Sequence, residues 1–277
     1  MLRLITIGCI LFCQSVFGAS LQIQIDGLSS TLESKVRKDL TLNMAITEPN
    51  LTAKRIKNLY NIATNEINTT LYALSYYNAS ISNTLQLLDA TQEKFYAHFI
   101  INLGPATTLN SVNLVIIGDG QDNNKLKAAL TTEKLIIGQP LTHEDYEATK
   151  TAILITAKQF GYLNAWLSQS VIEVNRHTNQ ANVKFSLVTQ AQYRFGTVHF
   201  ADSIYDKNLL KRYIPFEFGE PYTSEKMHKF SSNLEHADLF SKFYIDGNPD
   251  FEDIHNTLVP IYVRGTAKAS CIPYTSG

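Results

Sequence analysis

The chain has 277 residues, of which 44% are hydrophobic and 18% are charged, and its formal net charge at pH 7 is −1. This composition is typical of a globular protein and excludes a disordered, collagen-like or low-complexity chain. The balanced charge argues against a nucleic-acid-binding protein, and no apolar run approaches the roughly 18 residues of a membrane-spanning helix.

The first residues have the pattern of a secretory signal peptide. Arg3 supplies a positive charge, and residues 4–17 are largely apolar but too short to span a bilayer. The small residues Gly18 and Ala19 follow, where a signal peptidase would cleave. We therefore expect residues 1–19 to be a signal peptide that is removed on export.

The cysteines agree with an exported chain. A lipoprotein signal that uses Cys9 or Cys13 is the alternative to a cleaved signal peptide, but the large side chain of Phe12 precedes Cys13. Removal of residues 1–19 leaves Cys271, which cannot form a disulfide within one chain. The stability of the mature protein must then come from burial of apolar side chains.

Two short segments are nearly identical: GQPLT at 138–142 and GEPYT at 219–223, with PNLT at 49–52 as a looser third copy. Apolar residues recur at a spacing of three to four after each segment, which predicts three long amphipathic helices. The threonine that ends each segment is a natural N-cap. These threonines are Thr52, Thr142 and Thr223.

The segments before and after the long helices also repeat. Alternating apolar residues predict a first strand at 21–25, 112–116 and 195–200, each followed by a first helix. In the first copy this helix begins at a capping box formed by Ser30 and Glu33. Two further strands follow each long helix. They are expected at 80–88 and 95–101, at 165–174 and 183–187, and at 243–246 and 257–263.

Each repeat therefore has the order β-α-α-β-β. We predict an α+β fold of three tandem domains, each a three-stranded mixed sheet packed on two helices. The domains are expected at 20–104, 105–190 and 191–264. The tail at 265–277 departs from the repeat.

The residues carry few signs of catalysis or metal binding. The seven histidines lack the spacing of a zinc site, so His98 and His199 are interpreted as ordinary polar strand residues. A nucleophile-elbow motif is missing, Cys271 has no supporting context, and the glycine pair at 118–120 is better explained as a hairpin or a strand-to-helix turn. We therefore expect no catalytic residues, no cofactor and no metal.

Three glycosylation sequons, at Asn50, Asn68 and Asn78, leave a eukaryotic secreted protein as a minor alternative.

The order and spacing of several short motifs resemble a known family. These motifs lie at 27–29, 74–77, 161–162, 193–200, 214–216 and 219–222. They are similar to the polypeptide-transport-associated (POTRA) domains of TamA-like subunits of the translocation and assembly module. The resemblance implies a scaffold that helps assemble outer-membrane proteins such as autotransporters, on the periplasmic side of the outer membrane. It implies a TamB-like inner-membrane-anchored partner and unfolded outer-membrane protein clients.

TamA-like proteins continue into a membrane β-barrel, whereas this sequence stops at Gly277. We interpret it as a truncated or frameshifted product or a periplasmic fragment, which would be periplasmic if the barrel is absent. The alternatives are a POTRA arm of another assembly or two-partner secretion protein, such as a BamA-like protein, and a periplasmic enzyme.

The resemblance also indicates where a partner would bind. In POTRA domains the second strand forms the accessible edge of the sheet, so an extended polypeptide could add to it by β-augmentation. The second strands here are the segments near 79–87, 165–174 and 243–246. The candidate partner-binding residues on them are Ser80, Ser82, Leu167, Gln169, Val171, Phe243 and Ile245.

Overall fold

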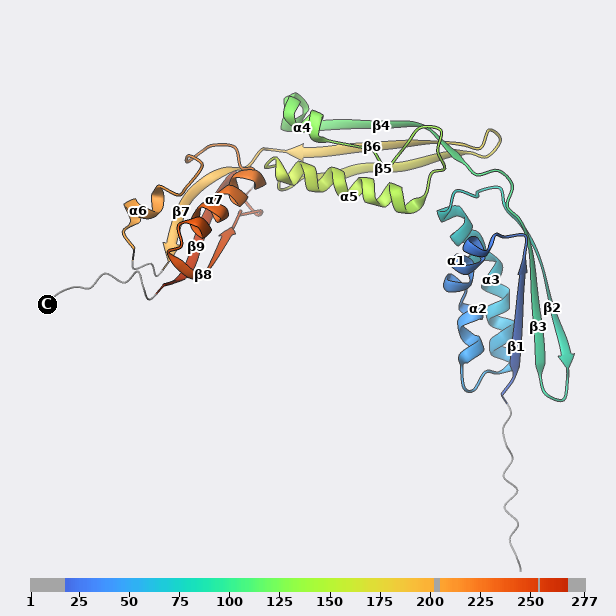
Figure 1. Ribbon diagram of the computed structural model, residues 1–277. Coiled ribbons are helices and arrows are strands. Elements are labelled where there is room, and N and C mark those ends of the chain that lie inside the picture. The colour runs from blue at the N-terminus through green and yellow to red at the C-terminus, as the bar shows by residue number, and fades with distance from the viewer. Residues whose placement is uncertain (1–17, 202–204, 254, 269–277) are drawn as a thin grey trace, which may run out of the picture. The chain divides into compact units, whose positions relative to one another are not determined.

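The computed structural model describes residues 18–201, 205–253 and 255–268 (Figure 1). The chain divides into two compact units, Met1–Thr107 and Thr108–Gly277. The first unit holds one three-stranded sheet and the second unit holds two. We call the three sheets, each with its helices, modules 1, 2 and 3. The predicted α+β class with three mixed three-stranded sheets is confirmed.

Module 1 forms the first unit. Its strand β1 runs parallel to β3, and β2 runs antiparallel to β3, so β3 is central. Its elements are β1 (Ser20–Asp26), α1 (Ser30–Asp39), α2 (Thr41–Met44), the 3-10 helix η1 (Ala45–Thr47), α3 (Ala53–Ala73), β2 (Ser80–Asp89) and β3 (Lys94–Asn102).

Modules 2 and 3 repeat the same strand order, with β6 central in one and β9 central in the other. The elements of module 2 are β4 (Thr108–Gly118), the 3-10 helix η2 (Asp119–Asp122), α4 (Asn124–Ala129), α5 (His143–Gln159), β5 (Trp166–Asn175) and β6 (Gln180–Gln190). The elements of module 3 are β7 (Arg194–Ala201), α6 (Lys207–Lys211), α7 (Ser224–His236), β8 (Phe240–Gly247) and β9 (Leu258–Ala267).

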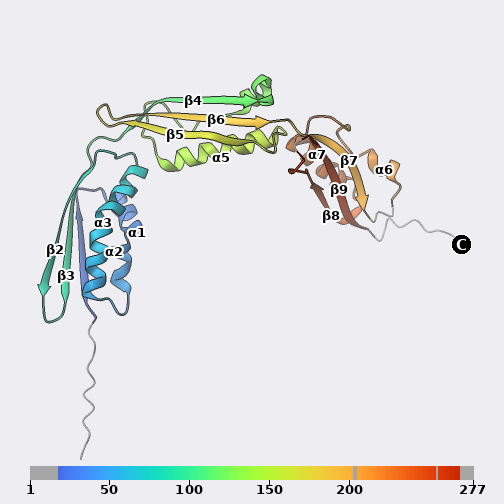
Figure 2. The same cartoon turned by 180° about the vertical axis from the view of Figure 1, so that it is seen from behind.

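Each module has its own apolar core between the sheet and its long helix. Every second residue of the central strand points into that core, because side chains alternate between the two faces of a strand. The long helices α3, α5 and α7 each lie along one face of their sheet, as Figures 1 and 2 show. We call the opposite face the open face. The buried apolar residues of the central strands are Phe95, Ala97, Phe99, Ile101, Ala181, Val183, Phe185, Leu187, Val259, Ile261 and Val263.

The predicted caps of the three long helices are confirmed. The hydroxyls of Thr52, Thr142 and Thr223 accept hydrogen bonds from backbone N–H groups of the first turn at 3.2, 3.1 and 3.3 Å. The cap expected at Ser30 is wrong by one residue. Ser29 has the extended backbone of an N-cap, and its hydroxyl accepts from the N–H of Leu32.

The third sheet is longer than the sequence pattern indicates. Strand β8 begins at Phe240 rather than at Phe243, and β9 continues to Ala267. Gly265 permits this extension, because a Cβ there would lie 2.6 Å from Cδ1 of Phe240. The glycine pair at 118–120 forms a strand-to-helix turn, since β4 ends at Gly118 and η2 follows.

Several expectations lie outside the described residues. They concern the signal peptide over 1–17 with its two cysteines, and the end of the tail with Cys271. Among the helices that the structure describes, none combines the length and the apolar character needed to span a bilayer.

Candidate polypeptide-binding edges

The strands β2, β5 and β8 each lie at one edge of their sheet. Each pairs with the central strand on one side only, so half of its backbone N–H and C=O groups point away from the sheet. We call these three outer edges the second-strand edges. The location expected for the second strands is therefore confirmed, while the binding of a partner there stays a prediction.

The seven candidate residues all lie on these strands, but their side chains face two ways. Ser80, Ser82 and Gln169 are exposed, and Val171 is 37% exposed. The remaining three pack against the apolar cores of modules 2 and 3, because strand residues alternate between faces. These three are Leu167, Phe243 and Ile245. They can offer a partner their backbone groups and not their side chains.

Bulges limit the regular part of each edge. In β5 the ladder shifts at Ser168, whose hydroxyl donates to the carbonyl of Ser186 at 3.2 Å. In β8 it shifts at Ser241, whose hydroxyl donates to the carbonyl of Thr266 at 3.1 Å. In β2 the shift comes at the far end, between Leu87 and Asp89. The regular edges that remain are 80–87, 169–175 and 242–247.

The opposite edges are partly closed by the repeated segments that the sequence makes conspicuous. In module 2 the N–H of Leu109 donates to the carbonyl of Gln139 at 2.8 Å, and Gly138 donates back to Leu109 at 2.7 Å. In module 3 the N–H of Phe195 donates to the carbonyl of Glu220 at 2.8 Å. The GQPLT and GEPYT segments thus pair with the start of the first strand before they begin the long helix. This leaves the second-strand edges as the more accessible ones at this end of the sheet.

The open face of module 1 carries a connected polar network that the sequence does not reveal. Nε2 of His98 lies 2.7 Å from Oδ2 of Asp26, and the amide of Gln24 donates to the same oxygen at 2.9 Å. The hydroxyl of Tyr96 donates to Oε1 of Gln24 at 2.5 Å. The hydrogen bonds from His98 and Gln24 hold the pKa of Asp26 below its ordinary value. His98 is thus one member of a surface network.

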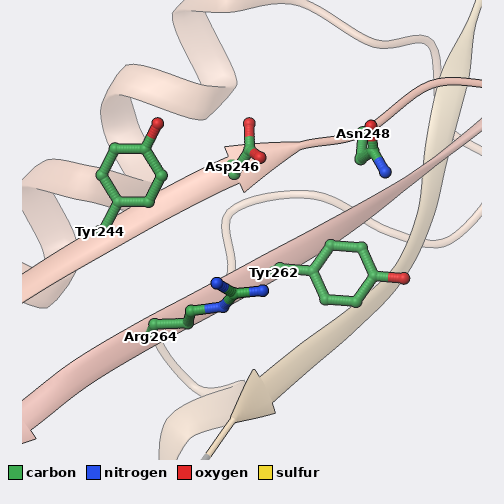
Figure 3. A pocket seen from close by; sticks show the side chains of 5 residues that line it. All are labelled: Tyr244, Asp246, Asn248, Tyr262 and Arg264. Carbon is green, nitrogen blue, oxygen red and sulfur yellow. The ribbon is translucent and has the colours of Figure 1, made fainter.

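The open face of module 3 carries a hollow of about 360 Å³ beside the β8 edge (Figure 3). Side chains from β8 and β9 line it, together with one residue of the loop that follows β8. They are Tyr244, Asp246, Asn248, Tyr262 and Arg264. The ring of Tyr262 also stacks on that of His199 in β7, with 5.0 Å between centroids. The sequence shows that Tyr244 and Asp246 lie on the same face of β8. It does not show which residues of β9 lie beside them, because that depends on strand register.

The residue types with metal-binding chemistry do not converge. Within the described ranges, no three histidine, cysteine, aspartate or glutamate side chains gather as a metal site would require. His98 and His199 lie on the sheets of different modules. What the described sheets present at their second-strand edges is backbone N–H and C=O groups, with polar and aromatic side chains beside them.

Comparison with known proteins gives likeness to solved structures, while no family model matches the chain. The chain is similar to POTRA domains 3–5 of BamA from Haemophilus influenzae, with 16% identity, a TM-score of 0.46 and coverage of 90% of this chain and 95% of that one. It is similar to POTRA domains 1–3 of Omp85 from Anabaena, with 13% identity, a TM-score of 0.32 and coverage of 91% and 96%. It is also similar to CdiB from Acinetobacter baumannii, with 16% identity and a TM-score of 0.34, and spans 39% of that protein's length.

Proposed function

We propose that this chain is a periplasmic scaffold without enzymatic activity, which binds extended polypeptides by β-augmentation at its second-strand edges. The observation that carries the proposal is the edge position of β2, β5 and β8 in all three sheets. A strand that adds there pairs with backbone groups. Such a strand needs no particular amino-acid sequence, which suits a protein that binds many unfolded clients.

The energies favour a weak, repeated interaction. A backbone hydrogen bond contributes about 0.5–1.5 kcal/mol net, and association itself costs about 4 kcal/mol or more. The regular edges, at 80–87, 169–175 and 242–247, each offer only a few such bonds. A client that engages more than one edge gains from the high effective concentration of the second site. Three edges on one chain thus support reversible holding of a client.

The sequence motifs support a narrower proposal. The chain would be the periplasmic arm of a TamA-like assembly factor at the outer membrane, with unfolded outer-membrane proteins, autotransporters among them, as clients and a TamB-like protein as partner. An arm of a BamA-like or two-partner secretion protein is the alternative, because the same edges would serve it equally well. The test is to purify the full chain from periplasm and to identify the proteins that come with it. A TamB-like protein would support the narrower proposal, and a secreted exoprotein substrate would support the two-partner secretion alternative.

The position of binding can be tested with backbone-modified peptides. The probe is a lysine-flanked peptide of alternating threonine and valine, with N-methyl groups on either its odd or its even residues. Because only every second N–H of an added strand faces the edge, one methylated series should lose binding to the full chain and the other should keep it. Equal binding of both series would overturn the proposal.

The same titration locates the edge. Amide signals of β2, β5 and β8 should shift in NMR spectra when the unmodified peptide is added, and those of β1, β4 and β7 should shift less. Shifts confined to the first-strand edges would contradict the assignment to the second strands. This readout does not depend on any variant of the protein.

A further inference from the structure

The β8 edge differs from the other two in the side chains that lie beside it on the open face. Strand β8 places Lys242, Tyr244 and Asp246 at alternate positions on that face, with Phe243 and Ile245 turned into the core. The register sets Arg264 of β9 directly opposite Tyr244, and Figure 3 shows these side chains around the hollow. A cation, an exposed ring and an anion thus follow one another along the edge.

The charged side chains at this place are Lys242, Asp246 and Arg264. Among the residues that the structure describes, none forms an ion pair or a side-chain hydrogen bond with Lys242, Asp246 or Arg264. The open faces of the other modules differ. In module 2, Nζ of Lys184 lies 2.7 Å from Oε1 of Glu173 on the neighbouring strand, and in module 1 His98 and Asp26 are 2.7 Å apart.

The exposure of the ring points the same way. Tyr244 is 67% exposed although it lies in the middle of a strand. Arg264 borders the hollow beside Asp246 and also a second hollow of about 480 Å³ that includes Lys242. Lys242 therefore lies at one end of the ring, Asp246 lies at the other end, and Arg264 lies opposite the ring on β9.

We propose that the β8 edge recognises an extended polypeptide that carries a carboxylate, an aromatic ring and a cationic group at alternate positions. This proposal rests on the proposed function, because a strand must add to β8 for its side chains to reach this face. Residues opposite one another on paired strands have Cβ atoms about 4.5–5.5 Å apart. The carboxylate would then face Lys242, the ring would lie on Tyr244, and the cation would face Asp246.

The charge order along β8 also links sequence to orientation. Since β8 runs from Lys242 to Asp246, a parallel strand would read acidic-x-aromatic-x-basic from its N-terminus. An antiparallel strand would read basic-x-aromatic-x-acidic, and this is the order expected to bind more tightly, because antiparallel pairing is the more stable of the two. The two orders have the same composition, so any difference in their binding reports the pattern of side chains and not net charge or hydrophobicity.

The test uses the full chain and two peptides, Glu-Thr-Phe-Thr-Lys and Lys-Thr-Phe-Thr-Glu, each placed in the threonine and valine host. We expect the preferred order to bind between about threefold and thirtyfold more tightly, since opposite charges on paired strands stabilise and like charges destabilise. The double variant Lys242→Glu with Asp246→Lys should reverse the preference. Both positions are exposed, and circular dichroism verifies that the variant is folded.

A matched control exchanges the paired charges of module 2, Lys184→Glu with Glu173→Lys, and should leave the preference unchanged. Equal binding of the two peptides, or a preference that the Lys242 and Asp246 exchange leaves unchanged, overturns the recognition at β8. If the odd-methylated and even-methylated peptides still differ in binding in that case, β-augmentation itself is supported. If the two methylated series bind equally, the proposed function itself has failed.

Discussion

The backbone N–H of Tyr193 donates a hydrogen bond of 2.8 Å to the carbonyl of Gly161, the second residue after the last turn of α5. The chain that leaves β6 is thereby tied to the end of the long helix of its own module. Module 1 has the same arrangement, since the N–H of Thr107 donates to the carbonyl of Ser75 after α3, also at 2.8 Å. Both acceptors have left-handed backbone, with φ of +87° at Gly161 and +80° at Ser75.

Replacement of Gly161 by alanine should destabilise the second unit by about 2–4 kcal/mol. A left-handed residue with a Cβ costs roughly 1–2 kcal/mol, and here the Cβ would also lie 2.4 Å from the carbonyl oxygen of Tyr222. Urea unfolding followed through the fluorescence of Trp166 measures the loss. Gly138→Ala is the matched control, because Gly138 has φ of +81° but open space around its Cβ. Equal losses in the two variants would show that the contact with Tyr222 is unimportant.

Replacement of Ser75 by glycine should stabilise module 1 by about 1–2 kcal/mol. Ser75 has left-handed backbone, and no described residue forms a hydrogen bond with its buried hydroxyl. Glycine relieves the strain and removes the unsatisfied group, and these gains exceed its greater loss of chain entropy. Thermal unfolding of the full chain measures the gain. Ser75→Ala removes only the hydroxyl and should gain less, so a lower melting temperature for Ser75→Gly than for Ser75→Ala would contradict this account.

The stability of module 1 should depend on Asp26 at acidic pH. The pKa of Asp26 in the folded chain lies below its ordinary value of 3.8, chiefly because of the hydrogen bond with His98. A carboxyl whose pKa falls on folding stabilises the fold above its ordinary pKa, and this contribution disappears as the pH falls through the lower, folded value. The stabilisation should therefore be complete well above pH 3.8 and disappear below it.

The comparison with Asp26→Asn isolates this carboxyl from others that titrate in the same range. The wild type should be more stable than the variant at neutral pH, and the difference should shrink as the pH falls below 3.8. Hydrogen exchange at the amide of Phe99, in the central strand of module 1, reports the local stability. A difference that stays constant across the pH series would exclude the hydrogen bond with His98 as its cause.

A proline at Val171 should weaken binding of an extended peptide to the β5 edge. Proline lacks the N–H group and is tolerated at sheet edges where that group faces solvent. Loss of one backbone hydrogen bond should raise the dissociation constant roughly threefold to tenfold. Val171→Ala shortens the same side chain and keeps the N–H, so it should bind almost as the wild type does. Equal affinities of the proline and alanine variants would argue against pairing at this edge, with Trp166 fluorescence verifying that module 2 remains folded.

The sequence predicts the local elements well because their signals are local. Thr52, Thr142 and Thr223 lie directly before amphipathic periods, and a capping hydroxyl needs only the N–H of the next turn. The error at Ser29 and Ser30 has the same origin, since two adjacent serines both fit a cap and the backbone angle decides between them. Which strand lies at the edge followed from the family resemblance and not from periodicity.

The candidate site was predictable only in part. The sequence locates the second strands, but only the structure shows that Leu167, Phe243 and Ile245 pack against the cores and leave their backbone groups for a partner. Bulges such as the one at Ser168 change which residues oppose one another, and the hydrophobic pattern of one strand does not reveal them.

The amino-acid sequence by itself determined the repeated β-α-α-β-β order, the caps of the three long helices and the apolar faces, because each depends on residues close together in the chain. The tertiary structure decided which residues of different strands stand side by side. The network of Asp26 with His98 and the juxtaposition of Tyr244 with Arg264 both depend on strand register. Register is set by packing between segments far apart in sequence, and a shift of one residue would turn these side chains to the other face.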